Sequence, residues 1–303
     1  MPLLTNQSSR FLGGGKLPAP VPTYGNNLIV NGTMETGSPP SNWTLVASAT
    51  LASYAENRPG GSGSKSLELT RGTTDVSGVS DTVTGVSNQW YCATAWVKKL
   101  DGTKGWISFN GVNSATANDN ITTNWAQQVR CGISTSTSHS IRLNQTGAQG
   151  TKSLFDDIEH RQVNLASAIS ARDNGMTHTS TKVRATIQQG SLCGVVCSLD
   201  SKTSPANMVV VLHNGYNVLY MFKCVAGTWT QLIYSNTVTY VANALIEVRR
   251  VSGTNTYQAY YNNAQVGTDQ TIDDAGIISN TLHGMFNLWG SNILTQYSSL
   301  PST

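Results

Sequence analysis

The chain has 303 residues, enough for about two domains, and only 12% of them are charged, against about 25% in an average globular protein. The net charge is +3 and the basic residues are scattered, whereas a nucleic-acid-binding protein needs a basic stripe. No apolar run reaches the ~20 residues of a membrane span. We therefore expect neither nucleic acid nor a membrane as a partner.

Residues 1–26 form a glycine- and proline-rich beginning. The stretch carries Gly13-Gly14-Gly15 and prolines 18, 20 and 22, and proline has no N–H and a fixed φ. We expect an extended N-terminal arm, which is either a disordered tail or a peg that orders on a partner surface. No hydrophobic leader follows Met1, so either a signal was removed before this numbering begins or the protein is made and matures in a cytoplasm. Because Met1 is present, we expect the second.

Short segments of alternating apolar and polar residues follow, separated by turn pairs such as Asp101-Gly102 and Asn110-Gly111. The first series of expected strands is Leu28–Val30, Thr44–Leu51, Ser66–Thr70, Tyr91–Lys98, Trp106–Asn110, Trp125–Gly132 and Ser138–Leu143. The second series is Thr181–Gln188, Leu192–Leu199, Met208–Leu212, Val218–Cys224, Trp229–Tyr234, Ala244–Val251, Thr256–Tyr261 and Gly284–Trp289.

This spacing predicts an all-β protein of two tandem, jelly-roll-type β-sandwich domains behind the arm. We place the domains at residues 27–163 and 172–303, with residues 164–171 as a connector or short helix.

The five cysteines are an odd set at irregular spacing. Cys193, Val195 and Cys197 alternate along one expected strand, where residues four apart lie ~13 Å apart, beyond disulfide reach. We expect buried free thiols there rather than a metal site.

Two motifs at the ends of the first domain carry a resemblance. The opening run Asn27-Leu28-Ile29-Val30-Asn31-Gly32-Thr33-Met34-Glu35, with Trp43 after it, resembles the N-L-I-x-N-G-x-F-E start of the carbohydrate-binding modules found beside xylanases and laminarinases. Met34 stands where that family has Phe. The segment 153–158, with Asp156-Asp157-Ile158, resembles the family's closing strand. Tyr91 to Val97 and the later Trp125 resemble its middle part.

The resemblance implies a jelly roll whose first and last strands are neighbours. It also implies a structural calcium ion between Glu35 and Asp157, with Asp156 in reserve. Calcium takes six to eight oxygen ligands, so paired carboxylates suit it. The alternative is solvated surface acids with no metal.

Sugar-binding modules use exposed aromatic rings as stacking platforms. In the strand from Tyr91, residues Ala93, Ala95 and Val97 share one face, so Trp96 points to the other; Trp106 likewise opposes Ile107. A hairpin at Asp101-Gly102 would bring Trp96 and Trp106 onto one outer face as a carbohydrate platform. The alternative is that they pack under a loop or a neighbouring domain.

Residues 172–303 more weakly resemble a laminin-G or concanavalin-A-like sandwich, notably over Gly194 to Asp200. Some members of that fold are glucanases, but their E-x-D-x-x-E run is absent here and Glu247 with Arg249 reads as a structural ion pair. We therefore predict no catalytic residues and a non-enzymatic protein.

Two functions remain. The first is a bacteriophage virion structural protein: a capsid decoration, head-fibre or tail-fibre component with glycan-binding-type domains. It would be assembled in the host cytoplasm, displayed on the virion surface and anchored to capsid or tail proteins through residues 1–26. Cell-surface glycans and a homo-oligomer are further partner options. The second is an extracellular carbohydrate-binding accessory of a secreted polysaccharide-degrading system.

Overall fold

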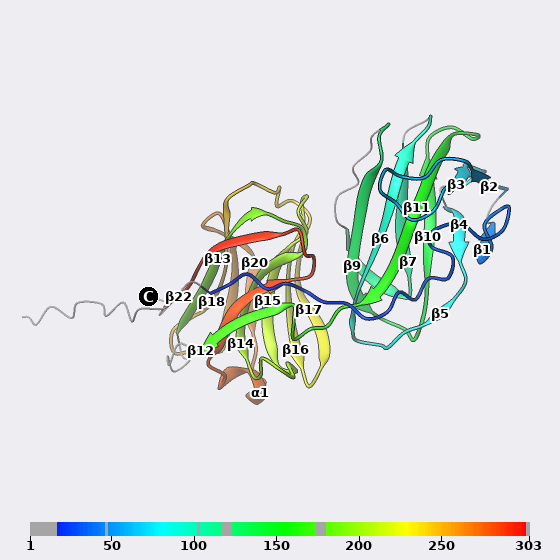
Figure 1. Ribbon diagram of the computed structural model, residues 1–303. Helices are drawn as coiled ribbons and strands as arrows, with labels where there is room; N and C mark the ends of the chain where they lie inside the picture. The colour runs from blue at the N-terminus through cyan, green and yellow to red at the C-terminus, as the bar shows by residue number, and fades with distance from the viewer. Residues whose placement is uncertain are drawn as a thin grey trace, which may run out of the picture.

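The computed structural model describes residues 17–45, 48–74, 76–101, 104–116, 123–173 and 180–300. Its regular structure is almost entirely antiparallel β, and the expected all-β fold of tandem sandwiches is confirmed (Figure 1). In the described ranges no helix is long and apolar enough to cross a bilayer. One short helix is present, α1 (Ala275–Ile278).

The first sandwich consists of two sheets. The six-stranded sheet has, in spatial order, β2 (Thr50–Tyr54), β3 (Ser66–Thr70), β11 (Lys152–Gln162), β6 (Trp90–Lys99), β9 (Ala126–Ser134) and β8 (Val112–Thr116). The five-stranded sheet is centred on β10 (Ser138–Thr146), which pairs with β4 (Val76–Ser80), β5 (Val83–Thr84) and β7 (Lys104–Asn110), while β4 also pairs with β1 (Trp43–Leu45).

The second sandwich repeats this two-sheet plan. Its six-stranded sheet has the order β12 (Ile169–Asp173), β21 (Leu282–Asn287), β14 (Cys193–Leu199), β15 (Met208–His213), β16 (Leu219–Val225) and β17 (Thr228–Ser235). Its five-stranded sheet has the order β20 (Ala264–Thr271), β19 (Thr256–Tyr261), β18 (Ala244–Arg250), β13 (Thr181–Gln189) and β22 (Ile293–Leu300).

Two expected strands differ in the structure. Leu28–Val30 is irregular backbone that runs beside β11, where the Leu28 N–H donates to the His160 carbonyl and the Ile158 N–H donates to the Gly32 carbonyl. Glycine is required at 32 because a Cβ there would lie 2.1 Å from the Ile158 carbonyl oxygen. The expected single strand Thr44–Leu51 is two strands, β1 and β2, which belong to different sheets.

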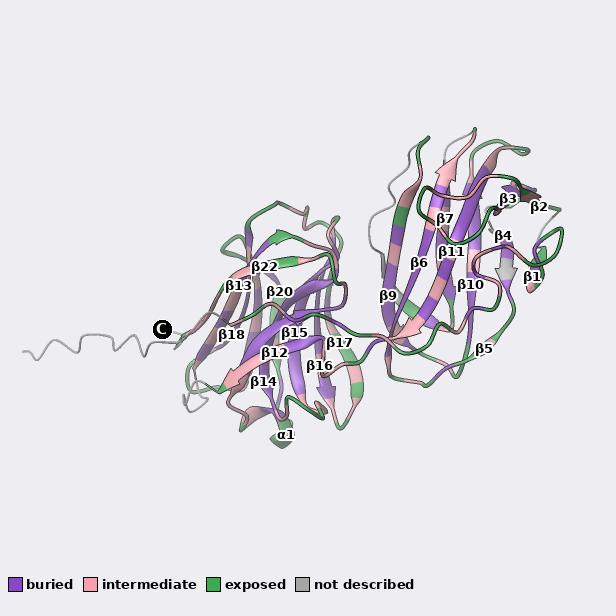
Figure 2. Ribbon diagram, viewed as in Figure 1, coloured by how far each residue is buried: buried purple, intermediate pink, exposed green. Residues whose placement is uncertain are grey.

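The hydrophobic core of the first sandwich follows the alternation along the chain (Figure 2). Ala93, Ala95 and Val97 of β6 pack with Ile107 of β7 and Leu143 of β10. The expected inward face of β6 is therefore confirmed, and Thr94 and Trp96 point away from this core.

Strands β14, β15 and most of β16 in the second sandwich are buried on both faces of their sheet. Val195 and Cys197 belong to the core between the two sheets, whereas Val196, Val210 and Leu212 belong to a separate cluster on the opposite face. Strands buried on both faces read as continuous apolar runs, as Met208 to Leu212 does. Cys193, Cys197 and Cys224 are buried free thiols, as expected for the first two.

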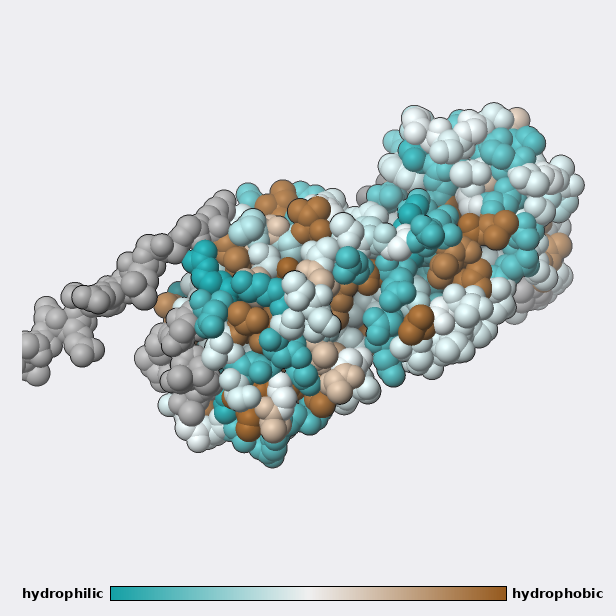
Figure 3. Space-filling view, turned by 60° about the horizontal axis from the view of Figure 1, so that its bottom comes forward, coloured by the Kyte–Doolittle hydropathy of each residue, from teal (hydrophilic) through white to brown (hydrophobic). Residues whose placement is uncertain are grey.

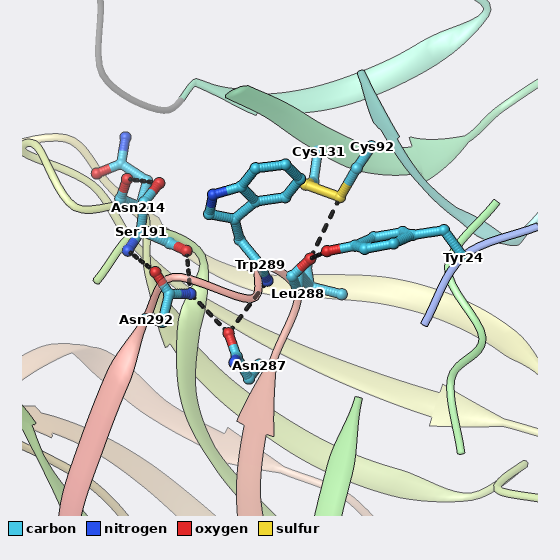
Figure 4. Close-up of a disulfide and its surroundings, with 9 residues drawn as sticks. All are labelled: Tyr24, Cys92, Cys131, Ser191, Asn214, Asn287, Leu288, Trp289 and Asn292. Carbon is cyan, nitrogen blue, oxygen red and sulfur yellow. Dashed lines mark hydrogen bonds between the residues drawn. A yellow bond between two sulfur atoms is a disulfide. The ribbon is translucent and has the colours of Figure 1, made fainter. Parts of the chain in front are cut away.

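The outer face of this sheet, which carries Val196, Val210 and Leu212, is covered partly by the first sandwich. Trp90 of β6 packs edge-on against Phe222 and Trp229, at ring-centroid distances of 5.6 and 5.5 Å. A disulfide between Cys92 and Cys131 joins β6 to β9 at this junction (Figure 4). The sequence reasoning did not foresee this bond, because directly opposed positions on two strands are invisible in cysteine spacing.

The described part of the N-terminal arm lies along the second sandwich and reaches the junction (Figure 1). Leu17 and Ala19 pack against the second core, and the Tyr24 hydroxyl donates to the Leu288 carbonyl at 2.8 Å (Figure 4). The Asn287 amide donates to the Pro20 carbonyl. Residues 17–26 are thus used within the chain rather than presented as a free peg, while residues 1–16 lie outside the described part.

Candidate functional site

A cavity of about 380 Å³ lies on the outer face of the six-stranded sheet in the first sandwich. We call it the Trp96 pocket. Thr94 and Trp96 of β6 and Gln127 of β9 form its floor, because they are the outward positions of their strands. Its walls come from the opening segment 27–33, the loop 58–62 and residues 157–159 of β11.

Arg58 organises one side of this pocket. Its guanidinium lies 4.6 Å from the centre of the Trp96 ring, within the range of a cation–π contact. Its Nε donates to Asp157 Oδ2 at 2.6 Å, and its backbone N–H donates to Asp156 Oδ2 at 3.1 Å. Trp96 is half-buried. Its ring contacts the Arg58 guanidinium and also lines the cavity.

A β-bulge places the two aspartates differently. The β11–β6 register shifts between Asp156 and Glu159, and Asp157 has a left-handed φ of +44°, a conformation that Asp tolerates better than most residues. Asp156 is therefore buried, and burial raises its pKa to about 6 although two backbone N–H groups oppose that rise. Asp157 instead lines the pocket.

A second group of polar contacts surrounds Trp125, which precedes β9. Glu56 accepts hydrogen bonds from Lys98 Nζ at 2.6 Å and from Trp125 Nε1 at 3.1 Å. The Lys98 hydrogen bond is the main cause that holds the pKa of Glu56 below its usual value, against a smaller opposing effect of burial. Trp125 is half-buried. Because Trp96 pairs with Gln127, Trp125 places a second indole at the Trp96 end of strands β6 and β9.

The predicted pairing of Trp96 with Trp106 is wrong. β6 pairs with β9 and β11, whereas β7 pairs with β10 in the opposite sheet, so the two indoles lie on different sheets of the sandwich. Trp106 lies instead beside the buried Arg130 of β9, whose guanidinium is 5.9 Å from the ring centre. β6 and β7, the strands on either side of the hairpin expected at Asp101-Gly102, belong to different sheets, and Gly102 itself lies outside the described residues.

The three carboxylates expected to hold calcium already have protein partners. Glu35 Oε1 accepts the N–H groups of Ser64 and Lys65 at 2.8 and 2.7 Å. Burial raises the pKa of Glu35, but these hydrogen bonds together outweigh it and the pKa is lowered. Asp157 is ion-paired with Arg58 and Asp156 accepts two N–H groups. Among the described residues no group of three or more His, Cys, Asp or Glu side chains is placed to hold a metal ion, and each of the three carboxylates would have to exchange a present partner for calcium.

The expected ion pair between Glu247 and Arg249 is confirmed in β18, where Arg249 also lies 3.6 Å from the Tyr260 ring centre. The partly exposed Arg249 guanidinium thus neutralises the buried Glu247 carboxylate. Glu247 is therefore held in a structural ion pair.

Hydrophobic residues on the face shown in Figure 3 form separate groups on both domains among hydrophilic ones. That face offers no single continuous apolar patch of the kind that marks a large protein interface.

A comparison with known protein families matched none, and a comparison with curated proteins matched none. Among solved structures the chain is similar to the carbohydrate-binding module CBM66 from Bacillus subtilis, at 12% identity over 44% of this chain and 81% of that chain (TM-score 0.34). It is similar to sheep galectin-11 in complex with glycerol, at 12% identity over 44% and 97% (TM-score 0.31). It is also similar to the CBM22-1–CBM22-2 tandem domain of Paenibacillus barcinonensis Xyn10C, at 10% identity over 94% and 99% (TM-score 0.36). Scores at this level carry no argument about function, which is argued below from the residues.

Proposed function

We propose that the protein is a non-enzymatic glycan-binding protein, and that its first sandwich holds a sugar chain in the Trp96 pocket. The observation that carries the proposal is a half-buried indole in a cavity whose other lining residues are mostly polar. A pyranose ring offers an apolar face that stacks on an indole, while its hydroxyls require hydrogen-bonding groups at the edge.

The polar groups of the pocket suit such a ligand. Gln127 offers an amide, Thr94 and Ser62 offer hydroxyls, and the Arg58 guanidinium is kept in place by Asp157. The volume lies within the ~300–1,000 Å³ that small-ligand sites occupy. A short segment of one sugar chain would fill it.

A binding role is favoured over hydrolysis by the state of the pocket's carboxylates. Asp157 is paired with Arg58, and Glu159 accepts two hydrogen bonds from Arg161. A glycoside hydrolase needs one carboxyl group as a proton donor and a second as nucleophile or base. Both of these carboxylates are instead engaged by guanidinium groups.

The test is retardation of the intact protein in native gels that contain neutral polysaccharides. We expect at least one polysaccharide to retard the wild type and the Trp96→Ala variant to lose about tenfold in affinity, since stacking on one ring contributes about 1 kcal/mol or more. Trp106→Ala is the matched control, because Trp106 lies on the opposite sheet, and it should be retarded like the wild type. Equal retardation of all three proteins would remove the Trp96 pocket from the proposal.

We further propose that the protein works on a bacteriophage virion, as a capsid decoration or fibre component. The Cys92–Cys131 disulfide supports a working place outside a reducing cytoplasm, such as a virion surface, and it equally supports the secreted accessory protein as the alternative. Because residues 17–26 are packed on the second sandwich, any anchor should lie in residues 1–16. Deletion of residues 1–16 should abolish co-purification with phage particles, and normal decoration by the truncated chain would rule out this anchor.

A further inference from the structure

A second cavity, of about 400 Å³, lies where the two sandwiches meet. We call it the junction groove. One wall is the outer side of β16 and β17 in the second sandwich, and the other is formed by the turn at Asn88, by Asn113 of β8 and by the end of β9. Figure 1 shows β16 and β17 on the side of the second sandwich that faces the first.

Aromatic rings line the second-sandwich wall. Tyr220 packs edge-on against Tyr234 at 5.5 Å and parallel to Phe222 at 5.6 Å, and Trp229 continues the row beyond Phe222. Tyr234 is 54% exposed and Trp229 is half-buried, so both rings remain partly open to solvent beside the groove. Two partly open rings on one side of a cavity, held in place by the buried Tyr220 and Phe222, give successive stacking positions to an elongated ligand.

The polar groups of the groove are uncharged. Asn88, Asn113 and Gln231 supply amides and are exposed, and Thr135 supplies an exposed hydroxyl. Among the described lining residues none carries a charge. Amides both donate and accept hydrogen bonds, as sugar hydroxyls do, whereas an acidic ligand would find no cation here.

Two further observations point to an occupant. Trp90 lines the groove, and its indole N–H is buried with no acceptor in the described part of the chain. A buried donor without a partner is unfavourable, and a ligand or water oxygen would relieve it. A neighbouring cavity of about 420 Å³ is also lined by Trp229. The adjacent residues Asn88 and Gln89 line the groove and the neighbouring cavity, respectively. A ligand longer than one sugar unit therefore has room to continue past Trp229.

We propose that the junction groove is a second glycan site, which takes a neutral oligosaccharide across the domain boundary with Trp229 and Tyr234 as stacking residues. The site extends the proposed function but depends on other residues than the Trp96 pocket does. Both sandwiches contribute to it, so it exists only when the two domains are in place.

The experiment is calorimetric titration of the full chain with a panel of neutral hexasaccharides of gluco-, xylo-, manno- and galacto-configuration. Tyr234→Ala and Gln231→Ala should each weaken binding at one site by about three- to tenfold. Because Tyr234 and Gln231 are exposed, their replacement should leave the fold intact. Tyr216→Ala is the matched control, since Tyr216 is a 65% exposed tyrosine of the same domain outside the groove.

The variants separate this site from the Trp96 pocket. Binding that survives Trp96→Ala but is weakened by Tyr234→Ala supports the junction groove and contradicts the Trp96 pocket. Binding that is lost in Trp96→Ala and unchanged in Tyr234→Ala and Gln231→Ala overturns the junction groove. A proline-rich peptide is the rival ligand for exposed Trp and Tyr rings, so binding of a polyproline decamer at this groove, with no oligosaccharide bound there, would also overturn the inference.

Discussion

Arg58 contacts the closing strand of the first sandwich at Asp157, one of the carboxylates that the resemblance to carbohydrate-binding modules implied as a calcium ligand. Its guanidinium is ion-paired with Asp157, whose side chain is only 13% exposed. A guanidinium gives one positive charge in a fixed geometry, and the neighbouring Glu35 is satisfied by the N–H groups of the 64–65 backbone. We therefore propose that the Arg58 guanidinium, rather than a metal ion, supplies the positive charge beside Asp157.

The first prediction follows from that arrangement. Addition of a calcium chelator should leave the melting temperature unchanged, because no metal–ligand bonds are lost. Arg58→Met should lower the free energy of unfolding by about 1–3 kcal/mol, since it leaves a largely buried carboxylate unpaired. Lys98→Met, which breaks the more exposed pair with Glu56, should cost less than about 1 kcal/mol. A chelator-induced drop in melting temperature that added calcium restores would contradict this account.

His160 is a buried histidine that makes the first sandwich sensitive to acid. Burial, with a smaller effect of the neighbouring His139, lowers the pKa of His160 to about 3. In the unfolded chain the ring binds a proton below about pH 6.5. The stabilisation by neutral His160 is thus complete above that pH and is lost as the pH falls toward 3.

Asp156 changes the stability in the opposite direction, because its pKa is raised to about 6 in the folded protein. As the pH falls, the folded state therefore takes up this proton before the unfolded chain does, which favours folding. We therefore predict the difference between two proteins rather than one curve. The stability advantage of the wild type over His160→Gln, measured by urea unfolding, should shrink steadily from pH 7 to pH 4. An advantage that stays constant over this range would show that His160 does not titrate as described.

At the scale of elements, β6 and β9 are joined both by their ladder and by the Cys92–Cys131 disulfide, which closes a loop of sequence separation 39. A bond of this span stabilises by about 3–4 kcal/mol through the unfolded state. The Cys92→Ala/Cys131→Ala variant should lose about this much in free energy of unfolding and should not respond to reductant. Thiol titration of the denatured, unreduced wild type should find three free thiols, and a count of five would contradict the disulfide.

The strands themselves were largely predictable from the sequence. Ser66–Thr70 and Thr256–Tyr261 coincide with β3 and β19, because strict alternation between turn residues fixes both ends. The Asn262-Asn263 turn between β19 and β20 has left-handed φ at both positions, as the residue type allows. Local alternation carries this information and needs no knowledge of the partner strand.

Which strands pair, by contrast, was not predictable from local pattern. The edge of β7 is covered by side chains of β9, where Gln128 bonds to the backbone of Gly105 and Ile107 and Arg130 bonds to the Ile107 carbonyl. These polar residues are buried against a strand far away in sequence. The separation of Trp96 from Trp106 and the Cys92–Cys131 bond depend on the same long-range pairing, and so the candidate site was only half predicted.

At the scale of the whole molecule, the two sandwiches share one hydrophobic cluster around Trp90, Phe222 and Phe286. The arm and the segment after β11 tie the same place together, since the Asn164 N–H donates to the Thr23 carbonyl. A junction packed in this way holds the two domains as one unit, whereas domains joined only by a flexible linker would move independently. The Trp96 pocket and the junction groove are therefore offered to a glycan from fixed positions.

The most direct measurement is a crystal structure of the intact chain with the oligosaccharide that binds it. The account predicts a pyranose ring stacked on Trp96, with hydroxyls within hydrogen-bond distance of Gln127 or Arg58, and further sugar density beside Trp229 and Tyr234. A bound sugar at some other surface, with the Trp96 pocket and the junction groove both free of it, would contradict the central claim.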